Sequence, residues 1–298
     1  MTATLVTGGR VLTPSSRDAT ALAHEGGVVV WAGSDAPAPA LFPEARHEDL
    51  GGDWVAPAFV ECLADGLDAD AAAARGVVLA GLPDAHGLDA AEARVRAGER
   101  VVLREDVDPT AAAAELTRLA AELRGPAVAR CAPTLVGAPD VDDAALGALA
   151  AVGAVILLRP LADDLSGTDL VRLAGSGAAL AASSRVGDEV RPWDALRALT
   201  AVDGGRGLSP RAAFTAVTRG ARRAAGSRDG VAGTLTVGAP ATYGRWATGE
   251  LVVAAADDAV QRWSTDPRSG VPPMPDLAGP DPVLRALVVD GRPRAGSE

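Results

Sequence analysis

The sequence contains no lysine and no asparagine, and the lack of lysine excludes several chemistries. Without a lysine amine the chain cannot form a Schiff base, anchor pyridoxal phosphate, bind a nucleotide through a P-loop lysine or bridge two metals through a carbamylated lysine. Cysteine is also scarce, because Cys62 and Cys131 are the only two. Two cysteines are too few for a disulfide scaffold, so the fold depends on an ordinary hydrophobic core.

An excess of basic charge is absent, and so are long apolar runs. The formal net charge is −11, which argues against nucleic acid and anionic membranes as partners because both are bound through basic patches. No run of about 18 apolar residues is free of charges and glycines, so we expect no membrane span. The first residues lack the basic start and apolar core of a secretory signal. We therefore expect a cytoplasmic protein.

The hydrophobic residues, 48% of the chain, follow two different rhythms. Short strands and turns fill residues 1–53 and return over residues 229–298, where they include a run at 233–238 and a proline-rich tail around 266–276. Between them, residues 54–228 alternate short apolar runs with helical segments, a pattern typical of parallel strands joined by right-handed crossovers. We predict an α/β protein with a TIM-type (β/α) barrel over 54–228 and a β-sandwich built from both termini.

The middle region is short for a complete barrel. We expect strands there at residues 55–60, 77–82, 100–104, 127–131, 154–158 and 178–182. The clearest helix starts at Asp108-Pro-Thr and stops at Gly125-Pro126, with Leu116 and Leu119 on its apolar stripe. An eightfold barrel usually takes about 250 residues and rarely fewer than about 200. The barrel is therefore predicted to be contracted or incomplete.

Five segments near the two ends share an ordered pattern with a known family. They are Leu5-Val-Thr-Gly-Gly-Arg-Val-Leu-Thr-Pro, Asp49-Leu-Gly-Gly-Asp-Trp-Val-Ala-Pro-Ala-Phe-Val-Glu, residues 208–226, Gly233-Thr-Leu-Thr-Val-Gly-Ala-Pro-Ala and Trp263-Ser-Thr-Asp-Pro-Arg-Ser-Gly-Val-Pro. Together they resemble the amidohydrolase superfamily, in its D-aminoacylase-like actinobacterial branch. The resemblance implies the barrel-and-sandwich fold and hydrolysis of carbon–nitrogen bonds. The middle of the chain matches poorly.

The positions that the resemblance assigns to metal ligands hold other residues. The family's first strand usually ends in Pro-Gly-Phe-Val-Asp-x-His-x-His, and here Pro57-Ala-Phe-Val-Glu-Cys-Leu-Ala-Asp places Leu63 and Asp65 at the histidines. A later histidine position falls at Cys131 or Ala132. The last strand's aspartate, which usually ligates the metal and takes a proton from its water, is replaced by Ser184. The resemblance therefore implies a protein that has lost its metal ligands and uses no cofactor.

Few residues remain from which a site could be built. Of the three histidines, His24 and His47 belong to the sandwich segments, so His86 is the only one in the barrel region. The polar residues expected at strand ends, most of them as solvated loop charges, are Glu61, Cys62, Asp65, Asp84, His86, Arg104, Glu105, Arg130, Cys131, Arg159, Asp163 and Ser184. Catalytic candidates among them are Asp65, His86, Cys131 and Ser184, and candidates for a substitute metal site are Cys62, Asp65 and His86.

Two functions stay open at this point. The first is a degenerate, non-metallo amidohydrolase-like pseudoenzyme that binds a small molecule or a partner. The second is a hydrolase of carbon–nitrogen (non-peptide) bonds with a rebuilt site, in which His86 activates Cys131 or Ser184 and an arginine holds an anionic ligand. A stable but functionless product is a third reading, against which the orderly hydrophobic pattern speaks. Since an open barrel exposes strand edges, we also expect a homodimer or pairing with an intact relative.

Overall fold

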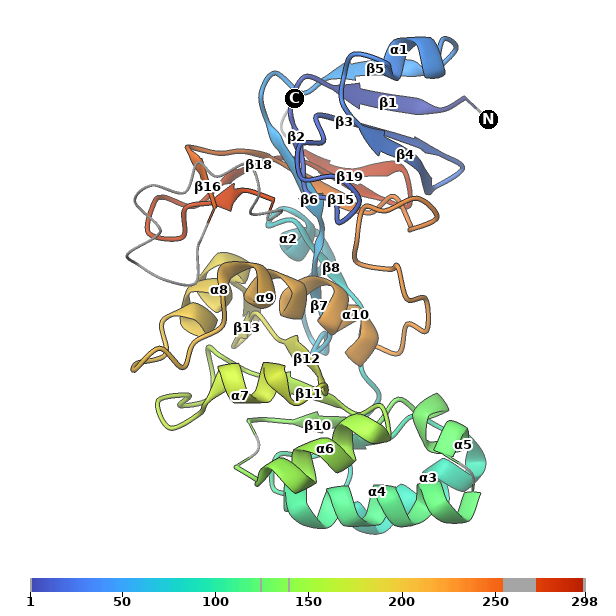
Figure 1. The fold of residues 1–298 in the computed structure, drawn as a ribbon, viewed down its shortest axis with the longest axis vertical. Coiled ribbons are helices and arrows are strands. Elements are labelled where there is room, and N and C mark those ends of the chain that lie inside the picture. Colours follow the sequence, from blue (N-terminus) through green and yellow to red (C-terminus); the bar gives the residue numbers. More distant parts are fainter. Residues whose placement is uncertain (1, 124, 139, 254–271, 297–298) are drawn as a thin grey trace. The chain divides into compact units, whose positions relative to one another are not determined.

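The computed structural model describes residues 2–123, 125–138, 140–253 and 272–296 (Figure 1). The chain forms two compact units. Unit 1 comprises Met1–Phe59, Asp68–Val78 and Asp229–Glu298, and unit 2 comprises Val60–Leu67 and Leu79–Arg228. Over the residues described, no helix combines the length and the apolar character that crossing a membrane requires.

Unit 1 contains two main sheets, one of four strands in the order β4-β3-β1-β5 and one of five in the order β19-β18-β15-β6-β2. The strands of the first are β1 (Thr4–Thr7), β3 (Ala21–Glu25), β4 (Val28–Gly33) and β5 (Arg46–Asp49). Those of the second are β2 (Arg10–Val11), β6 (Trp54–Pro57), β15 (Tyr243–Ala247), β18 (Val283–Val289) and β19 (Arg292–Gly296). Segments from both ends of the chain therefore share one sheet.

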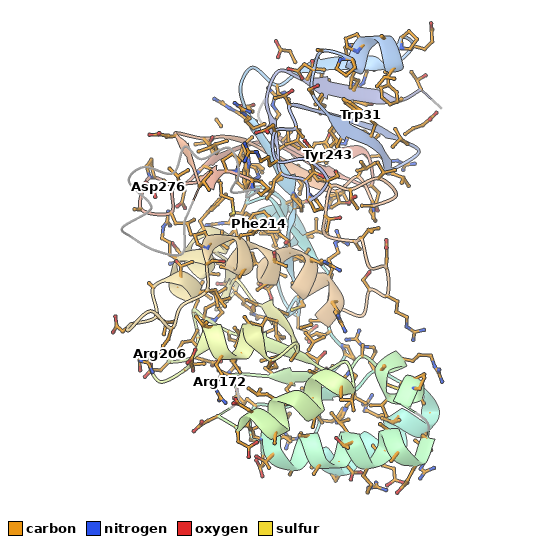
Figure 2. The ribbon with its side chains drawn as sticks, viewed as in Figure 1. Trp31, Arg172, Arg206, Phe214, Tyr243 and Asp276 are labelled. Carbon is orange, nitrogen blue, oxygen red and sulfur yellow. The ribbon has the colours of Figure 1, made fainter. Side chains whose placement is uncertain are left out.

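A single apolar cluster in unit 1 draws on both sheets. Leu22 of β3 and Val29 of β4 pack in it with Val55 of β6 and Tyr243 of β15, all buried. Tyr243 is labelled in Figure 2. The phenol oxygen of Tyr243 lies 3.3 Å from His24 Nε2, so the ring keeps a polar partner inside the core. The same unit also holds the short helices and strands α1 (Ala38–Leu41), α2 (Ala69–Ala73), β16 (Leu251–Val252) and β17 (Met274–Pro275).

Unit 2 is built on a four-stranded sheet in the order β12-β11-β10-β9, in which all neighbouring strands run parallel. Its strands are β9 (Val102–Leu103), β10 (Thr134–Val136), β11 (Val155–Leu158) and β12 (Ala179–Ala182). Two further strands, β7 (Phe59–Glu61) and β8 (Val77–Leu79), pair with each other, and the chain passes between the units within them. The α/β class is thus confirmed.

Helices follow the strands of unit 2 as crossovers. They are η1 (Leu88–Ala90), α3 (Ala91–Ala97), α4 (Pro109–Leu123), α5 (Gly125–Arg130), α6 (Asp143–Ala151), α7 (Leu170–Gly175), α8 (Pro192–Thr200), α9 (Pro210–Thr215), η2 (Ala216–Gly220) and α10 (Ala221–Ala224). A hairpin of β13 (Arg185–Val186) and β14 (Glu189–Val190) follows β12. Helix α4 packs against α5 and α6 (Figure 1).

One edge strand of the parallel sheet, β9, has a further partner within unit 2, because His86 forms a parallel bridge with Leu103. Near the other edge strand, β12, Val60 and Cys62 of the β7 segment share a buried cluster with Ala181. The described strands nevertheless form no continuous ladder of backbone hydrogen bonds around a barrel, so a contracted barrel stays a prediction.

Several of the predicted elements are present in the structure, and one predicted strand is not. The helix expected after Asp108 is α4, with Leu116 and Leu119 buried, and the strands expected at 154–158 and 178–182 are β11 and β12. The strand predicted at 127–131 is wrong: those residues lie in and just after α5, and the strand follows as β10. A short apolar run fits either structure, and Pro126 stands at the start of α5, where proline favours a helix.

The run at 233–238 is also not a strand, because it forms turns around two glycines with positive φ, Gly233 at 80° and Gly238 at 90°. Its Leu235 is buried, and the Leu235 carbonyl accepts a hydrogen bond from Thr13 Oγ1 at 2.8 Å. The proline-rich tail and the family-like segment 263–272 fall largely within residues 254–271, outside the described residues.

Candidate functional site

A cavity of about 490 Å³ lies in unit 2 at the carboxyl ends of its strands. Val102 of β9, Val136 at the end of β10 and Arg159 directly after β11 line it. The loops that follow β7 and β8 contribute Leu63 and Leu82. Ligands of α/β folds bind at the carboxyl ends of parallel strands, so this cavity is the candidate site.

Beside the cavity is a fully buried carboxylate, that of Glu61 at the end of β7. Its Oε1 accepts hydrogen bonds from Leu63 N and Ser183 Oγ, both at 2.8 Å. Its Oε2 accepts from Ser184 N at 2.7 Å and from Ser184 Oγ at 3.1 Å. A carboxylate has about four lone-pair positions, so these four donors leave no position free for a metal or a substrate proton.

Glu61 is held in this position because the residues around it, on β7 and directly after β12, are themselves buried. Val60 and Cys62, its neighbours, pack into the apolar cluster of unit 2 with Ala181 of β12. The two serines directly follow β12 and are 2% and 1% exposed, so no water replaces them as donors. A buried charge needs such compensation, because an unpaired one would be strongly destabilising. Glu61 thus links the end of β7 to the end of β12.

Arg185 makes a second link in the same sense. From the start of β13, its Nη1 donates to the backbone carbonyls of Leu63 at 2.8 Å and Asp65 at 2.7 Å. Its Nε donates to the Gly187 carbonyl at 2.7 Å. Donors from the segment after β12 therefore hold both Glu61 and the loop that follows it. Both contacts fix the wall of the cavity, which Arg185 lines.

The other cation of the lining, Arg159, is paired with carboxylates. Its guanidinium binds Asp163 Oδ1 at 2.6 Å and forms an ion pair with Glu105. The hydrogen bond with Asp163 raises the pKa of Arg159 further above its ordinary value, and Glu105 adds to the effect. Arg159 therefore connects the loop after β11 to the loop after β9 and has its charge neutralised there.

The structure does not bring the four catalytic candidates together. Asp65 is exposed and lines the cavity, while Ser184 is buried against Glu61. His86 is half-buried, and both ring nitrogens have partners: Nδ1 lies 2.9 Å from the Gly87 carbonyl, and Nε2 accepts from Val102 N at 3.3 Å. Cys131 is buried at the end of α5. No nucleophile–base pair is formed by these four residues.

Both cysteines are core residues. Cys62 packs with Val155 and Leu157 of β11, and burial, with the nearby Glu61 charge, raises the pKa of its thiol. The Cys131 Sγ lies 3.3 Å from the Ala127 carbonyl, and burial raises its thiol pKa as well. Since the thiolate is the form that attacks or ligates, neither residue is prepared for catalysis or metal binding.

The residues present do not fit the metal centre that the family resemblance implies. Leu63, at a position that the resemblance assigns to a histidine, lines the cavity, and a leucine side chain offers no ligand atom. Ser184, at the aspartate position, directs its hydroxyl to Glu61. Within the described ranges, no three His, Cys, Asp or Glu side chains are grouped so that they could hold a metal ion.

Two residues of the site were not among the catalytic candidates. Glu61 was recognised only as one polar residue at a strand end, although a charged residue inside a hydrophobic strand run is a signal of a buried, satisfied group. Arg185 was not singled out. Its signal was weaker: an arginine directly after Ser183-Ser184 at the end of a predicted strand.

No protein-family model and no curated protein matches the chain. Solved structures do match over nearly its whole length. A prolidase complexed with N-methylphosphonate-L-proline is 15% identical with a TM-score of 0.58, covering 99% of this chain and 100% of that one. The guanine deaminase of E. coli is 14% identical with a TM-score of 0.58, covering 100% of both chains.

The atrazine chlorohydrolase of Arthrobacter aurescens, solved with zinc, is 13% identical with a TM-score of 0.61, covering 98% of this chain and 95% of that one. Identities this low show the fold alone. The chain therefore has a mixed α/β fold that resembles solved amidohydrolase structures.

Proposed function

We propose that this protein is a small-molecule binding protein on an amidohydrolase-like fold, without metal-dependent hydrolysis. One observation carries the proposal: a cavity remains at the carboxyl ends of the strands, while the metal-ligand positions hold Leu63 and a Ser184 committed to Glu61. Hydrolysis through a metal needs a bound water whose pKa the metal lowers. The residues of this site do not provide the ligands for such an ion.

The alternative is a hydrolase of carbon–nitrogen bonds with a rebuilt, metal-free site. It would need a nucleophile and a base within hydrogen-bond reach of each other and of the substrate. Ser183 is the hydroxyl that lines the cavity, but it is 2% exposed, donates to Glu61 and accepts from Arg185 N at 3.1 Å. An oxygen held this way is a structural donor, so we favour binding over turnover.

The test is an activity screen run beside a binding screen. Purified protein is incubated with N-acylated amines and cyclic amides, with and without added zinc or manganese, and an active hydrolase of each substrate class serves as the positive control. We expect no turnover by this chain and stabilisation of its thermal unfolding by members of a fragment library. Turnover that is abolished in Asp65→Ala or His86→Ala would overturn the proposal in favour of the hydrolase.

A partner role is part of the same proposal. We expect a homodimer, or pairing with an intact relative through the terminal sheets, and light scattering at micromolar concentration measures the first of these. Within unit 2, β9 already has a partner at its edge, the bridge from His86 to Leu103. A dimer would therefore use an edge other than this one.

A further inference from the structure

We infer that the ligand of this cavity is an organic anion, held with its acidic group at Arg185 and its aliphatic body against the cavity walls. The inference rests on the proposed binding function and adds the chemical class of the ligand. Three features of the cavity support it. Arg185 is held in place without a carboxylate partner among the described residues, the other charged residues of the lining are either paired or hydrated, and no aromatic side chain lines the walls.

Arg185 is fixed but not neutralised. Three backbone carbonyls, those of Leu63, Asp65 and Gly187, hold Nη1 and Nε. Carbonyl oxygens orient a guanidinium without cancelling its charge. In the part of the chain that the structure describes, Nη2 makes no hydrogen bond and no acidic side chain forms an ion pair with Arg185. A planar guanidinium held in this way is prepared to bind a carboxylate or a similar oxyanion.

The remaining charges of the lining do not provide a comparable site. Arg159 is compensated by Asp163 and Glu105. Asp65 and Asp84 are exposed, and no hydrogen bond to either carboxylate fixes it among the described residues. Exposed carboxylates are hydrated and screened by salt, so their attraction for a ligand ammonium is weak. Arg185 is therefore the charge that selects the ligand.

The walls define the other end of the ligand. The aliphatic side chains that line the cavity are Leu63, Leu82, Val102, Val136, Leu161 and Val186. No aromatic side chain is among the lining residues, so stacking of a flat ring has no partner here. A volume of about 490 Å³ lies in the ordinary range of small-molecule sites. A compact saturated body with one acidic group matches these walls.

Three probes of nearly the same shape test the class directly: cyclohexylacetate, cyclohexylacetamide and cyclohexylmethylamine. Their affinities for the full-length protein are measured by calorimetry or ligand-observed NMR at low ionic strength. A hydrogen bond to a charged group is worth more than a neutral one, so we expect the carboxylate to bind about tenfold to a hundredfold more tightly than the amide. The preference should shrink as salt is added.

Variants of Arg185 test whether this residue causes the preference for the carboxylate. We expect Arg185→Gln to abolish the preference for the carboxylate and Arg185→Lys to retain part of it, because lysine keeps the charge but not the fork. Arg206→Gln is the matched control, since Arg206 (labelled in Figure 2) also donates to backbone carbonyls, those of Asp203 and Ser166, and is not among the residues that line the cavity. It should leave all three affinities unchanged. If Arg185→Gln does not fold, the three probes and the salt dependence decide on the wild type.

The outcomes separate the two proposals. Equal affinities for carboxylate and amide, or tightest binding of the amine, would overturn the anion assignment. Loss of that same binding in Val136→Trp, which fills the cavity, would show that the site itself still binds ligands. If neither these probes nor a fragment library binds folded wild-type protein at millimolar concentration, the binding function is wrong and the anion assignment falls with it.

Discussion

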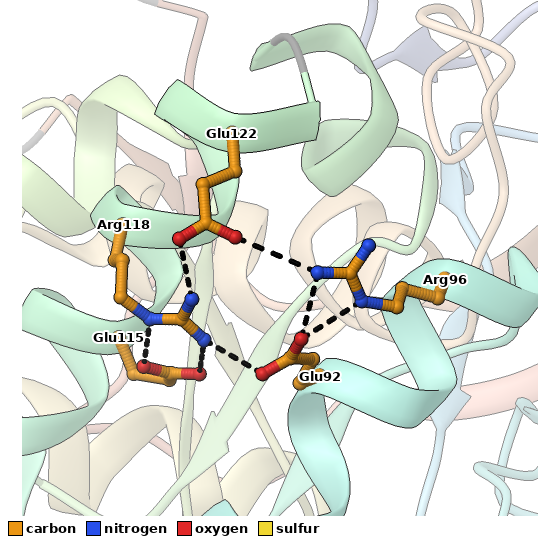
Figure 3. A network of polar contacts seen from close by, with 5 residues as sticks. All are labelled: Glu92, Arg96, Glu115, Arg118 and Glu122. Carbon is orange, nitrogen blue, oxygen red and sulfur yellow. Dashed lines mark hydrogen bonds and ion pairs between the residues drawn. The ribbon is translucent and has the colours of Figure 1, made fainter.

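Two clusters in unit 2 are both built around glutamate carboxylates, but the carboxylates have different partners and different exposure to solvent. On the face of α3 and α4, Glu92, Arg96, Glu115, Arg118 and Glu122 form a network in which Arg118 pairs with three glutamates (Figure 3). Beside the cavity, Glu61 has no basic partner among the residues that the structure describes and is held by the backbone and hydroxyl donors of Leu63, Ser183 and Ser184. The first cluster is exposed to solvent, and the second is buried.

The comparison shows that the number of ion pairs is a poor guide to how much a cluster stabilises the fold. Water competes for every charge in the α3–α4 network, so each exposed pair contributes little. Water does not reach Glu61, so removal of its carboxylate would leave buried donors without partners. The buried cluster also joins strand ends that border the candidate site, whereas the network only connects neighbouring helices.

The largest effect is expected from Glu61→Ala. The change leaves several buried donors unpaired, each costing about 1 to 3 kcal/mol, and we expect a loss of about 3 to 5 kcal/mol in the free energy of unfolding of unit 2. Urea denaturation followed by circular dichroism measures it. Glu99→Ala, an exposed glutamate paired only with Arg94, is the control and should be nearly neutral. Equal losses at the two positions would contradict the comparison.

Ser184→Ala should come next. It removes one hydroxyl donor while Ser184 N still binds Glu61, so we expect a loss of about 1 kcal/mol. A double-mutant cycle with Glu61→Gln sharpens the result, because residues in direct contact couple rather than add. Strict additivity would mean that the Ser184 hydroxyl and Glu61 do not act together.

A smaller and salt-dependent effect is expected from Arg118→Ala. Hydrogen bonds from Arg96 and Arg118 lower the pKa of Glu92, and those from Arg118 lower the pKa of Glu115. A lowered folded-state pKa stabilises the protein above the unfolded pKa, near about 4.3, and this contribution is lost as the pH falls through the folded value. The deficit of the variant should therefore be visible at neutral pH and disappear in acid and in high salt.

Arg172→Ala is the comparison for Arg118→Ala, since Arg172 pairs with one exposed carboxylate, that of Asp143 (Figure 2). Thermal unfolding at low and high salt measures both. A deficit of Arg118→Ala that is larger than that of Ser184→Ala, or one that salt does not reduce, would contradict the view that the α3–α4 network is weak.

The smallest effect is expected at the cysteines. Burial raises the thiol pKa of Cys62 and of Cys131, so little thiolate exists at neutral pH. We expect neither thiol to react with a disulfide reagent in the native protein on the time scale on which both react in urea. Rapid native labelling of Cys131 would return it to the list of catalytic candidates.

Much of the fold follows from local patterns in the sequence. The helix α4 and the strands β11 and β12 can each be predicted from the hydrophobic pattern of a short stretch of sequence. The run at 127–131 was misassigned because a short apolar segment fits both helix and strand, and only the packing decides between them.

The candidate site was harder to predict because its contacts are long-range. Glu61 and Ser183 are 122 residues apart, and no local pattern pairs them. Arg185 is positioned by backbone carbonyls, which carry no sequence signature. The family resemblance points to residues 57–65 and to Ser184. It could not show that Glu61, rather than Asp65 or His86, connects them.

Metal content tests the central claim most directly, namely that this amidohydrolase-like fold has a binding cavity in place of a metal centre. Untagged protein is purified without chelator, dialysed and analysed by mass spectrometry for zinc, iron, nickel and manganese. We predict far less than one metal ion per chain, before and after incubation with excess zinc. About one ion retained per chain, lost on Asp65→Ala, would contradict the account and restore hydrolysis as the leading function.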